Sequence, residues 1–328
     1  MKRLVTLFLA LVMTLALTGC GAKKSEEAIT FVLDWTPNTN HTGLYVAIAK
    51  GYFAEEGITV EVVQPPEDGA EMLVASGRAQ FGVSFQDYLA PGLGRKDPLP
   101  ITAVAAVVQH NTSGIISRAG EGMDTPAGLG GKKYATWDLP VEKATMQHVV
   151  EADGGDFSAV ELIPSTVTDE VSALRSGSVD AIWVYYGWAG IACEVAGLET
   201  DYFAFADIDP VFDFYSPVII GSDAYLKAHP EEAKAFVKAL ARGYTFAAEH
   251  PEEAAEILME AAPELKSSEE LVVESQKYLS QRYVDDAPCW GWIDSGRWDA
   301  FYGWLNEKGL VEVSIPAGSG FCNEYLPE

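Results

Sequence analysis

Basic residues are scarce in this sequence. Its 328 residues include 22 Lys and Arg against 48 Asp and Glu, which gives a formal net charge of −26 at pH 7. A surface with this charge repels phosphate backbones, so the composition argues against nucleic-acid binding. The charge also disfavours an anionic ligand, although a local pocket can oppose the overall field.

Cysteines and familiar catalytic motifs are few as well. After Cys20 come only Cys193, Cys289 and Cys322, whose spacing is not that of a metal site. Cys289 and Cys322 could pair in an oxidising compartment. The chain has no Gly-x-Ser-x-Gly elbow, no His-Glu-x-x-His helix and no glycine-rich phosphate loop. These absences predict a protein that is not an enzyme and carries neither metal nor cofactor.

Long apolar runs are also missing, except for one at the start of the chain. Met1-Lys2-Arg3 is followed by the apolar segment 4–17 and then by Thr18-Gly19-Cys20. This order of basic, apolar and small residues is typical of a secretory signal peptide. The apolar run of about 14 residues is shorter than the ~20 that span a bilayer, so a transmembrane helix is disfavoured.

The cysteine that follows Leu17-Thr18-Gly19 resembles the bacterial lipobox, in which the cysteine is acylated and becomes the new N-terminus. We therefore expect a signal peptide over 1–19, lipidation at Cys20 and a linker over 20–28. The remainder would work outside the cytoplasm, anchored to the bacterial cell membrane as a lipoprotein. A plain secretory signal with a chance cysteine is the alternative.

The rest of the chain contains an internal repeat. Segment 73–81 (LVASGRAQF) resembles segment 173–181 (ALRSGSVDA), and their Ser-Gly pairs lie 100 residues apart. Each copy follows a Pro-containing loop and precedes an apolar, strand-like run. The period is too long for a solenoid, and two lobes built alike fit it better.

Alternating strand and helix patterns predict an α/β fold with ligand at the carboxyl ends of the strands. Strands are expected at 29–33, 58–63, 81–85, 101–109, 133–136, 160–163, 181–185 and 218–221. Helices are expected at 41–50, 70–76, 141–152 and 169–175. From 231 to 309 the chain should be mostly helical, with amphipathic runs at 231–249, 251–260 and 268–282.

Candidate ligand contacts lie in the loops that follow these strands. The loop 34–41 offers Trp35, Asn38 and His41, but it fits a capped turn with Trp35 in the core equally well. The matching loop of the second lobe offers Tyr186 and Trp188 to stack on a flat ring, with Glu194 bonding to polar atoms at the ring edge. Further candidates at strand ends and crossovers are Ser84, Phe85, Ser113, Trp137 and Tyr215, and hinge structure alone is the alternative for the crossover residues.

Segments 34–43 (DWTPNTNHTG) and 49–57 (AKGYFAEEG), with the two Ser-Gly modules, resemble the thiamine-pyrimidine-precursor binding proteins of bacterial ABC importers. Yeast-type thiamine pyrimidine synthases are related to them. The resemblance covers about residues 28–242 and implies a type II periplasmic-binding-protein fold with two similar α/β lobes, a cleft and two crossover segments. Lobe one would be 29–113 plus 219–328, and lobe two 114–218.

The resemblance also implies a ligand and partners. Trp35 would stack on an aminopyrimidine, with Glu194 as its polar partner. The protein would be a monomer that closes on its ligand, serves an ABC permease with its ATPase, and touches the membrane through lipid alone. Similar proteins bind nitrate, sulfonates or riboflavin, so these ligands and other aromatic amines stay open. A sulfonate would need basic groups, which are few near the candidate loops.

The synthases differ from this chain at positions that matter for their chemistry. In them, the strand after the first Ser-Gly module carries a Lys and, four residues later, a His, which hold a vitamin cofactor. Here Ser84 and Tyr88 stand at these positions, and segment 211–215 lacks the cysteines of the synthases. These departures and the lipobox favour a binding protein over a pyrimidine synthase.

Overall fold

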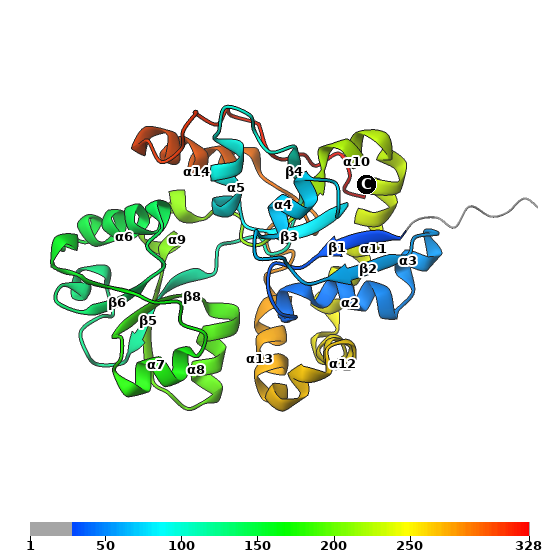
Figure 1. The fold of residues 1–328 in the computed structure, drawn as a ribbon. Helices are drawn as coiled ribbons and strands as arrows, with labels where there is room; N and C mark the ends of the chain where they lie inside the picture. The colour runs from blue at the N-terminus through cyan, green and yellow to red at the C-terminus, as the bar shows by residue number, and fades with distance from the viewer. Residues whose placement is uncertain (1–27, 328) are drawn as a thin grey trace, which may run out of the picture.

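The computed structural model describes residues 28–327, and it has two lobes side by side, each built on a five-stranded sheet (Figure 1). The expected signal peptide over 1–19 and the lipidation of Cys20 lie outside these residues and stay predictions. Within 28–327, no helix combines the length and the apolar character needed to cross a membrane.

The sheet of lobe one has the strand order β2-β1-β3-β10-β4. β1 pairs in parallel with β2 and β3, whereas β10 runs antiparallel between β3 and β4. In sequence order its strands are β1 (Ile29–Val32), β2 (Val60–Val63), β3 (Phe81–Ser84), β4 (Ile101–Ala106) and β10 (Val218–Ser222).

The sheet of lobe two repeats this topology in the order β7-β6-β8-β5-β9. β6 pairs in parallel with β7 and β8, and β5 runs antiparallel between β8 and β9. Its strands are β5 (Ser113–Arg118), β6 (Lys133–Thr136), β7 (Glu161–Pro164), β8 (Ala181–Tyr185) and β9 (Thr200–Ala204). Each antiparallel strand, β5 or β10, is therefore the first strand after a crossover from the other lobe. This arrangement confirms the predicted two-lobed α/β fold.

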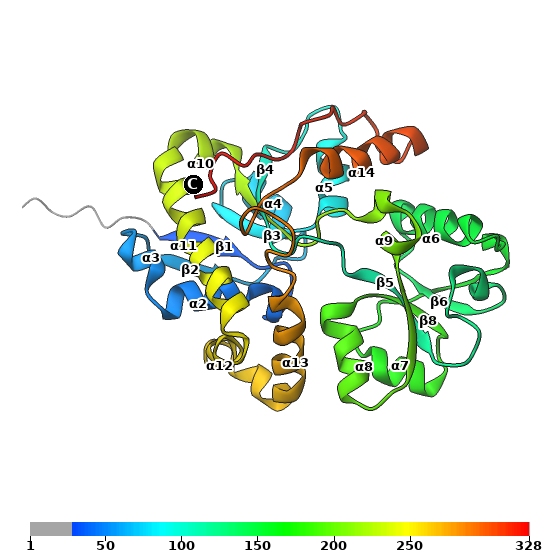
Figure 2. The same ribbon diagram turned by 180° about the vertical axis from the view of Figure 1, so that it is seen from behind.

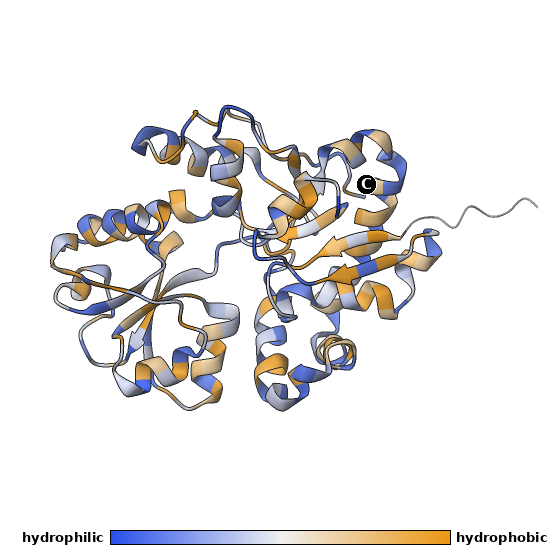
Figure 3. Ribbon diagram, in the orientation of Figure 1, coloured by the Kyte–Doolittle hydropathy of each residue, from blue (hydrophilic) through white to orange (hydrophobic). Residues whose placement is uncertain are grey.

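Helices cover both sheets, whose strands include some of the most hydrophobic parts of the ribbon (Figures 1 and 3). With lobe two lie α6 (Pro140–Ala152), α7 (Glu170–Ser176), α8 (Ile191–Val195) and α9 (Phe205–Ile208). The other helices are α2 (Thr42–Ala49), α3 (Tyr52–Glu55), α4 (Ala70–Ala75), α5 (Gln86–Leu93), α10 (Asp223–Ala228), α11 (Pro230–Glu249), α12 (Pro251–Ala261), α13 (Glu269–Ser280) and α14 (Ser295–Lys308).

The structure contains a strand or helix at every predicted segment, and it adds others, among them β5, β9 and α5. β5 and β9 were not predicted, because β5 begins with Ser-Gly and the edge strand β9 carries no continuous apolar run. The helix α5 was missed because Pro91 and Gly92 lie inside it. The predicted strand 101–109 ends earlier, at Ala106.

The helices α2 and α11 approach each other closely on one face of the lobe-one sheet (Figure 2). A Cβ on Gly43 would lie 2.2 Å from the Tyr244 ring, and one on Gly243 would lie 2.0 Å from the Gly43 carbonyl oxygen. Tyr244 also donates a hydrogen bond of 2.6 Å to the carbonyl of Asn40. This glycine-dependent contact therefore fixes the start of α2 and the loop before it.

The two crossover segments, 107–112 and 205–217, are bonded to each other. The Asp213 carboxylate accepts a 2.9 Å hydrogen bond from the Asn111 amide and lies 2.7 Å from Nδ1 of His110. Asn111 also donates to the Phe212 carbonyl, and Arg297 of α14 donates to the Gln109 carbonyl. The hydrogen bond to Asp213 raises the pKa of His110. These contacts hold the two crossovers side by side.

The described cysteines, Cys193, Cys289 and Cys322, are all free. The possible Cys289–Cys322 disulfide is therefore not formed in this structure. Burial raises the pKa of all three thiols, so they have little thiolate character near neutral pH.

Candidate functional site

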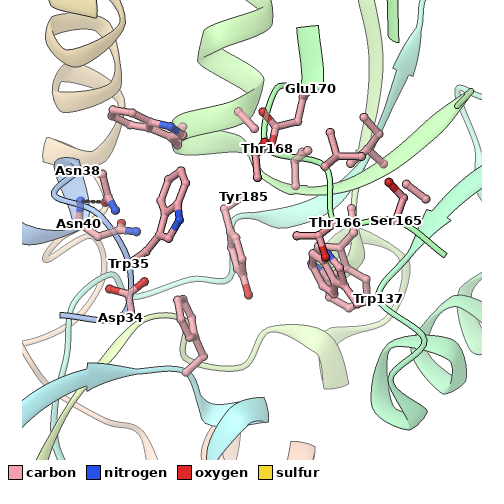
Figure 4. Close-up of a pocket in the computed structure, with 18 of the residues that line it drawn as sticks. Asp34, Trp35, Asn38, Asn40, Trp137, Ser165, Thr166, Thr168, Glu170 and Tyr185 are labelled. Carbon is pink, nitrogen blue, oxygen red and sulfur yellow. Dashed lines mark hydrogen bonds between the residues drawn. The ribbon is translucent and has the colours of Figure 1, made fainter. Parts of the chain in front are cut away.

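A cavity of about 310 Å³ lies between the lobes, at the carboxyl ends of β1, β3, β6, β7 and β8 (Figure 4). We call it the interlobe cavity. This is where ligands bind in sheets of this kind. It is lined by Asp34, Trp35, Asn38, Asn40, Phe85, Tyr88, Ala135, Trp137, Ser165, Thr166, Val167, Thr168, Glu170, Ile182, Trp183, Val184, Tyr185, Trp188 and Ala189.

The loop after β1 is held rigidly by its own polar side chains. The Asn38 side chain accepts a 2.9 Å hydrogen bond from the Asn40 amide and caps the following turn. The buried His41 ring accepts from the Asn38 amide at Nδ1, so its proton is on Nε2, which lies 2.6 Å from Asp34. These bonds leave Trp35 46% exposed and facing the cavity, so the alternative that Trp35 is a core residue is wrong.

Helix α13 contacts the loop after β1 in lobe one and the loop after β8 in lobe two. The Ser275 hydroxyl lies 2.6 Å from the Thr39 hydroxyl and donates to the carbonyl of Gly187 in lobe two. Tyr283 donates a 2.8 Å hydrogen bond to the Thr39 carbonyl. One helix of lobe one therefore holds both loops at this end of the cavity.

Aromatic side chains form facing walls of the interlobe cavity. Figure 4 shows Trp35 and Trp137 on opposite sides, with Tyr185 between them. Phe85 of lobe one stacks on Tyr185 of lobe two, with ring centroids 5.5 Å apart and an interplanar angle of 24°. A flat, apolar ligand would find stacking partners from both lobes.

Among the described residues, two carboxylates, Asp34 and Glu170, line the cavity, and no Lys, Arg or His does. Asp169 caps α7 by accepting a 2.9 Å hydrogen bond from the Ser172 amide, which places Glu170 in the first turn at the cavity. Burial raises the pKa of Glu170, and the nearby Asp169 adds to the shift. The cavity therefore favours neutral or cationic ligands with hydrogen-bond donors.

The structure brings some of the residues predicted from the sequence into this cavity and leaves others outside. Those in the lining are Trp35, Asn38, Phe85, Trp137 and Trp188. Those outside it are His41, Ser84, Ser113, Tyr186, Glu194 and Tyr215. For this second group, ligand contact stays a prediction.

The residues outside the lining are buried or make hydrogen bonds within the protein. His41 bonds to Asp34, and the Ser84 hydroxyl donates to Glu71, so both lie one layer behind the cavity. Exposed Glu194 accepts a hydrogen bond from the Tyr186 hydroxyl. Ser113 is buried in β5, and the buried Tyr215 hydroxyl accepts a 2.8 Å bond from the Asp294 amide.

The lining thus contains a glutamate, Glu170, that the sequence did not single out, in addition to Asp34, whereas Glu194 lies outside it. Glu170 follows the strand β7, so the same strand-end rule could have found it together with segment 165–168. Trp183 and Tyr185 were not among the residues expected to contact ligand, because alternate residues of a strand can face the core. Both line the cavity, since the end of this central strand opens into it.

The sequence has recognisable relatives. The family model described as NMT1/THI5 like matches residues 38–254. A formylaminopyrimidine-binding protein of Halalkalibacterium halodurans is 31% identical, and the alignment covers 98% of each chain. The 4-amino-5-hydroxymethyl-2-methylpyrimidine phosphate synthase THI13 of Saccharomyces cerevisiae is 23% identical, over 92% of this chain and 88% of its own.

Solved structures share the fold. The alkanesulfonate-binding protein SsuA of Xanthomonas axonopodis pv. citri, bound to MOPS, superposes with a TM-score of 0.66. The match covers 90% of this chain and 98% of that one, at 13% sequence identity. At this identity the likeness concerns the fold, and it confirms the predicted periplasmic-binding-protein architecture.

Proposed function

The chain belongs to the NMT1/THI5-like family, and from this premise we propose that it is the solute-binding protein of an ABC importer. Its ligand is a small amine heterocycle of the thiamine-pyrimidine type, as the name of the Halalkalibacterium halodurans relative suggests. The observation that carries the proposal is the interlobe cavity, whose lining within residues 28–327 combines aromatic walls from both lobes with two carboxylates and no basic side chain.

The aromatic walls suit a single flat ring. Stacking of a heterocycle on one aromatic side chain contributes roughly 1–3 kcal/mol. Trp35 provides such a face from lobe one, and Trp137 with Tyr185 provides others from lobe two. A cavity of about 310 Å³ is at the small end of ligand pockets. It favours one ring with short substituents over riboflavin, which has three fused rings and a sugar-like chain.

The acids suit an exocyclic amine. An aminopyrimidine presents an N–H donor beside a ring nitrogen that accepts, and Glu170 can take the first bond as a carboxylate. Because burial raises the pKa of Glu170, this acid can also share its proton with the ring nitrogen. Such a charge-assisted bond contributes roughly 1.5–3 kcal/mol. A sulfonate would instead face Asp34 and Glu170 with no cation beside it.

Cleft closure would convert binding into a signal for the permease. The bonded crossovers around Asp213 act as the hinge, and ligand held between Trp35 and lobe two favours the closed form.

Lipidation at Cys20 would keep the protein at the membrane. A Cys20→Ser variant should then leave the membrane fraction, and a wild-type protein that is already fully soluble after cell breakage would refute the anchor.

A pyrimidine synthase is the second candidate, since the yeast relative aligned over 92% of this chain is named as one. Against it stand Ser84, whose hydroxyl is bonded to Glu71, and Tyr88, at the positions where the synthases carry Lys and His. A turnover assay with pyridoxal phosphate and iron separates the two functions. We expect no pyrimidine product, and sustained product formation would favour the synthase.

Calorimetric titration tests the ligand class. We expect 4-amino-5-hydroxymethyl-2-methylpyrimidine to bind with one site per chain, and riboflavin and an alkanesulfonate to bind at least tenfold more weakly. Tighter binding of either competitor would overturn the proposed ligand while leaving the binding-protein class intact.

A further inference from the structure

The two lobes also contact each other outside the interlobe cavity, between η4 and α13. η4 (Tyr186–Gly190) is a single turn of π-helix that follows β8 in lobe two. Figures 1 and 2 both show α13 of lobe one next to α8, the helix that continues η4. Turns of π-helix are rare and occur frequently at functional sites. The residues of α13 that meet η4, which are Ser275, Tyr278 and Leu279, do not line the cavity.

At Gly187, the backbone of lobe two lies directly against α13. A Cβ on Gly187 would lie 2.8 Å from Cδ2 of Leu279 and 3.3 Å from Cδ1 of Tyr278. The Ser275 hydroxyl donates a hydrogen bond to the Gly187 carbonyl, and both groups are buried. A side chain at position 187 would push η4 away from α13, so this close approach depends on glycine.

Two tyrosine rings extend the contact. The rings of Tyr186 and Tyr278 have centroids 5.4 Å apart and an interplanar angle of 42°. In lobe two, the Tyr186 hydroxyl donates to Glu194. In lobe one, Cζ of Arg282 lies 3.5 Å from the centroid of the Tyr278 ring. Because each ring is held within its own lobe, the two surfaces can meet with little further loss of side-chain entropy.

The contact between η4 and α13 is joined to both loops that face the interlobe cavity. Trp188 of η4 lines the cavity and also packs against an apolar cluster of α12 and α13 in lobe one. On the other side, the Ser275 hydroxyl lies 2.6 Å from the hydroxyl of Thr39, in the loop that carries Trp35. A movement of lobe two relative to lobe one therefore changes this contact and the cavity together.

Opening of the lobes would break the contact. The Arg282 carbonyl accepts a 2.9 Å hydrogen bond from the Gln109 amide of the first crossover, so the chain after α13 is attached at the hinge. About 7 Å of helix separates Ser275 from Ser280, the last residue of α13. A rotation about the crossovers therefore moves Gly187 away from Ser275.

We propose that Tyr186, Gly187, Ser275 and Tyr278 form an interlobe latch, which stabilises the closed form whether or not a ligand is bound. All its groups belong to the protein, so its contribution does not depend on which molecule fills the cavity. The apparent affinity of a ligand that needs the closed form scales with the fraction of protein that is closed. The latch thus tunes affinity from outside the cavity. This inference goes beyond the proposed function and does not depend on the identity of the ligand.

Two variants weaken the latch from opposite sides. Ser275→Ala removes the hydroxyl that bonds to lobe two, and Gly187→Ala places a methyl group against α13 without removing any group that contacts Thr39. Ser280→Ala is the matched control, because the Ser280 hydroxyl donates to the Lys277 carbonyl of its own helix. Melting temperatures identify a variant that does not fold, and the other variant then decides.

Small-angle X-ray scattering of the ligand-free proteins measures opening directly. We expect Ser275→Ala and Gly187→Ala to have a larger radius of gyration than wild type, and Ser280→Ala to match wild type. Saturating 4-amino-5-hydroxymethyl-2-methylpyrimidine should bring all four proteins to the same value. Ligand-free latch variants that scatter as wild type does would overturn the proposal. The ligand-free comparison decides the latch even if the pyrimidine does not bind and the proposed function fails.

Binding kinetics followed by stopped-flow fluorescence give a second readout. Loss of one hydrogen bond between the lobes should raise the dissociation rate of the same pyrimidine from Ser275→Ala by about 2- to 12-fold, because the closed form opens more often. The association rate depends on the open form and should not fall. Slower association with an unchanged dissociation rate would contradict the latch and favour a role for Ser275 in supporting Thr39 alone.

Discussion

Trp35→Ala is the substitution that most sharply separates a ligand-binding role from a structural one. The side chain is 46% exposed and lines the interlobe cavity, so little packing is lost on its removal. The loop keeps its form through the hydrogen bonds of Asn38 and His41, which do not involve the indole. The loss of one stacking face of roughly 1–3 kcal/mol corresponds to a Kd increase of about 5- to 150-fold.

Titration calorimetry with 4-amino-5-hydroxymethyl-2-methylpyrimidine measures this loss, and thermal unfolding measures stability in parallel. Trp292→Ala is the matched control, because Trp292 is also an exposed tryptophan, at 38%, and lies outside the cavity. We expect Trp35→Ala to weaken binding by about 5- to 150-fold with little change in Tm, and Trp292→Ala to leave affinity unchanged. An unchanged Kd in Trp35→Ala, or a large fall in its Tm, would refute the reasoning.

Further predictions concern Glu170, the contact between α2 and α11, and His110 in the first crossover. Glu170→Gln should weaken pyrimidine binding by roughly 1.5–3 kcal/mol in calorimetry, and an unchanged affinity would contradict its role; Glu194→Gln, measured in parallel, tests the contact predicted for Glu194. Gly43→Ala should lower the free energy of unfolding in urea by about 1–3 kcal/mol, because its Cβ would meet the Tyr244 ring; an unchanged midpoint would disprove the contact. The pKa of His110 is raised chiefly by its bond to Asp213, with Arg297 and Asp286 also nearby. Stability from a raised histidine pKa is complete below the ordinary value of about 6.5 and is lost as pH rises through the folded-state value. His110→Gln should therefore cost more stability at about pH 5.5 than at about pH 9, and a cost independent of pH would contradict this.

Most of the fold follows from local patterns. The apolar runs at β1, β3 and β8 and the repeated Ser-Gly modules indicate two similar lobes, because each run is buried in the centre of a sheet. The strands β5 and β9 lack a local apolar pattern that would predict them. β9 is an edge strand whose residues are mostly half-buried, so it needs no strong apolar signal, and its pairing with β5 is decided by the crossover geometry.

Residues of the cavity lining could be predicted where a loop after a strand contains both aromatic and polar side chains, as at Trp35 and Asn38. Glu170 and Tyr185 were harder to recognise, because an acid at a helix start and an aromatic residue in a strand usually have structural roles. What places them at the cavity is the approach of the two lobes. That approach depends on contacts between distant segments, such as Asn111 with Asp213 and Ser275 with Gly187, which no local pattern encodes.

We propose that the chain binds a thiamine-type pyrimidine without converting it. Native mass spectrometry of the protein purified from its own host tests this most directly, with the ligand then released by denaturation and identified by fragmentation. We predict one non-covalent ligand per chain, with the mass and fragments of an aminopyrimidine. A sulfonate, a flavin or covalently bound pyridoxal phosphate in its place, or a protein without any bound molecule, would contradict the account.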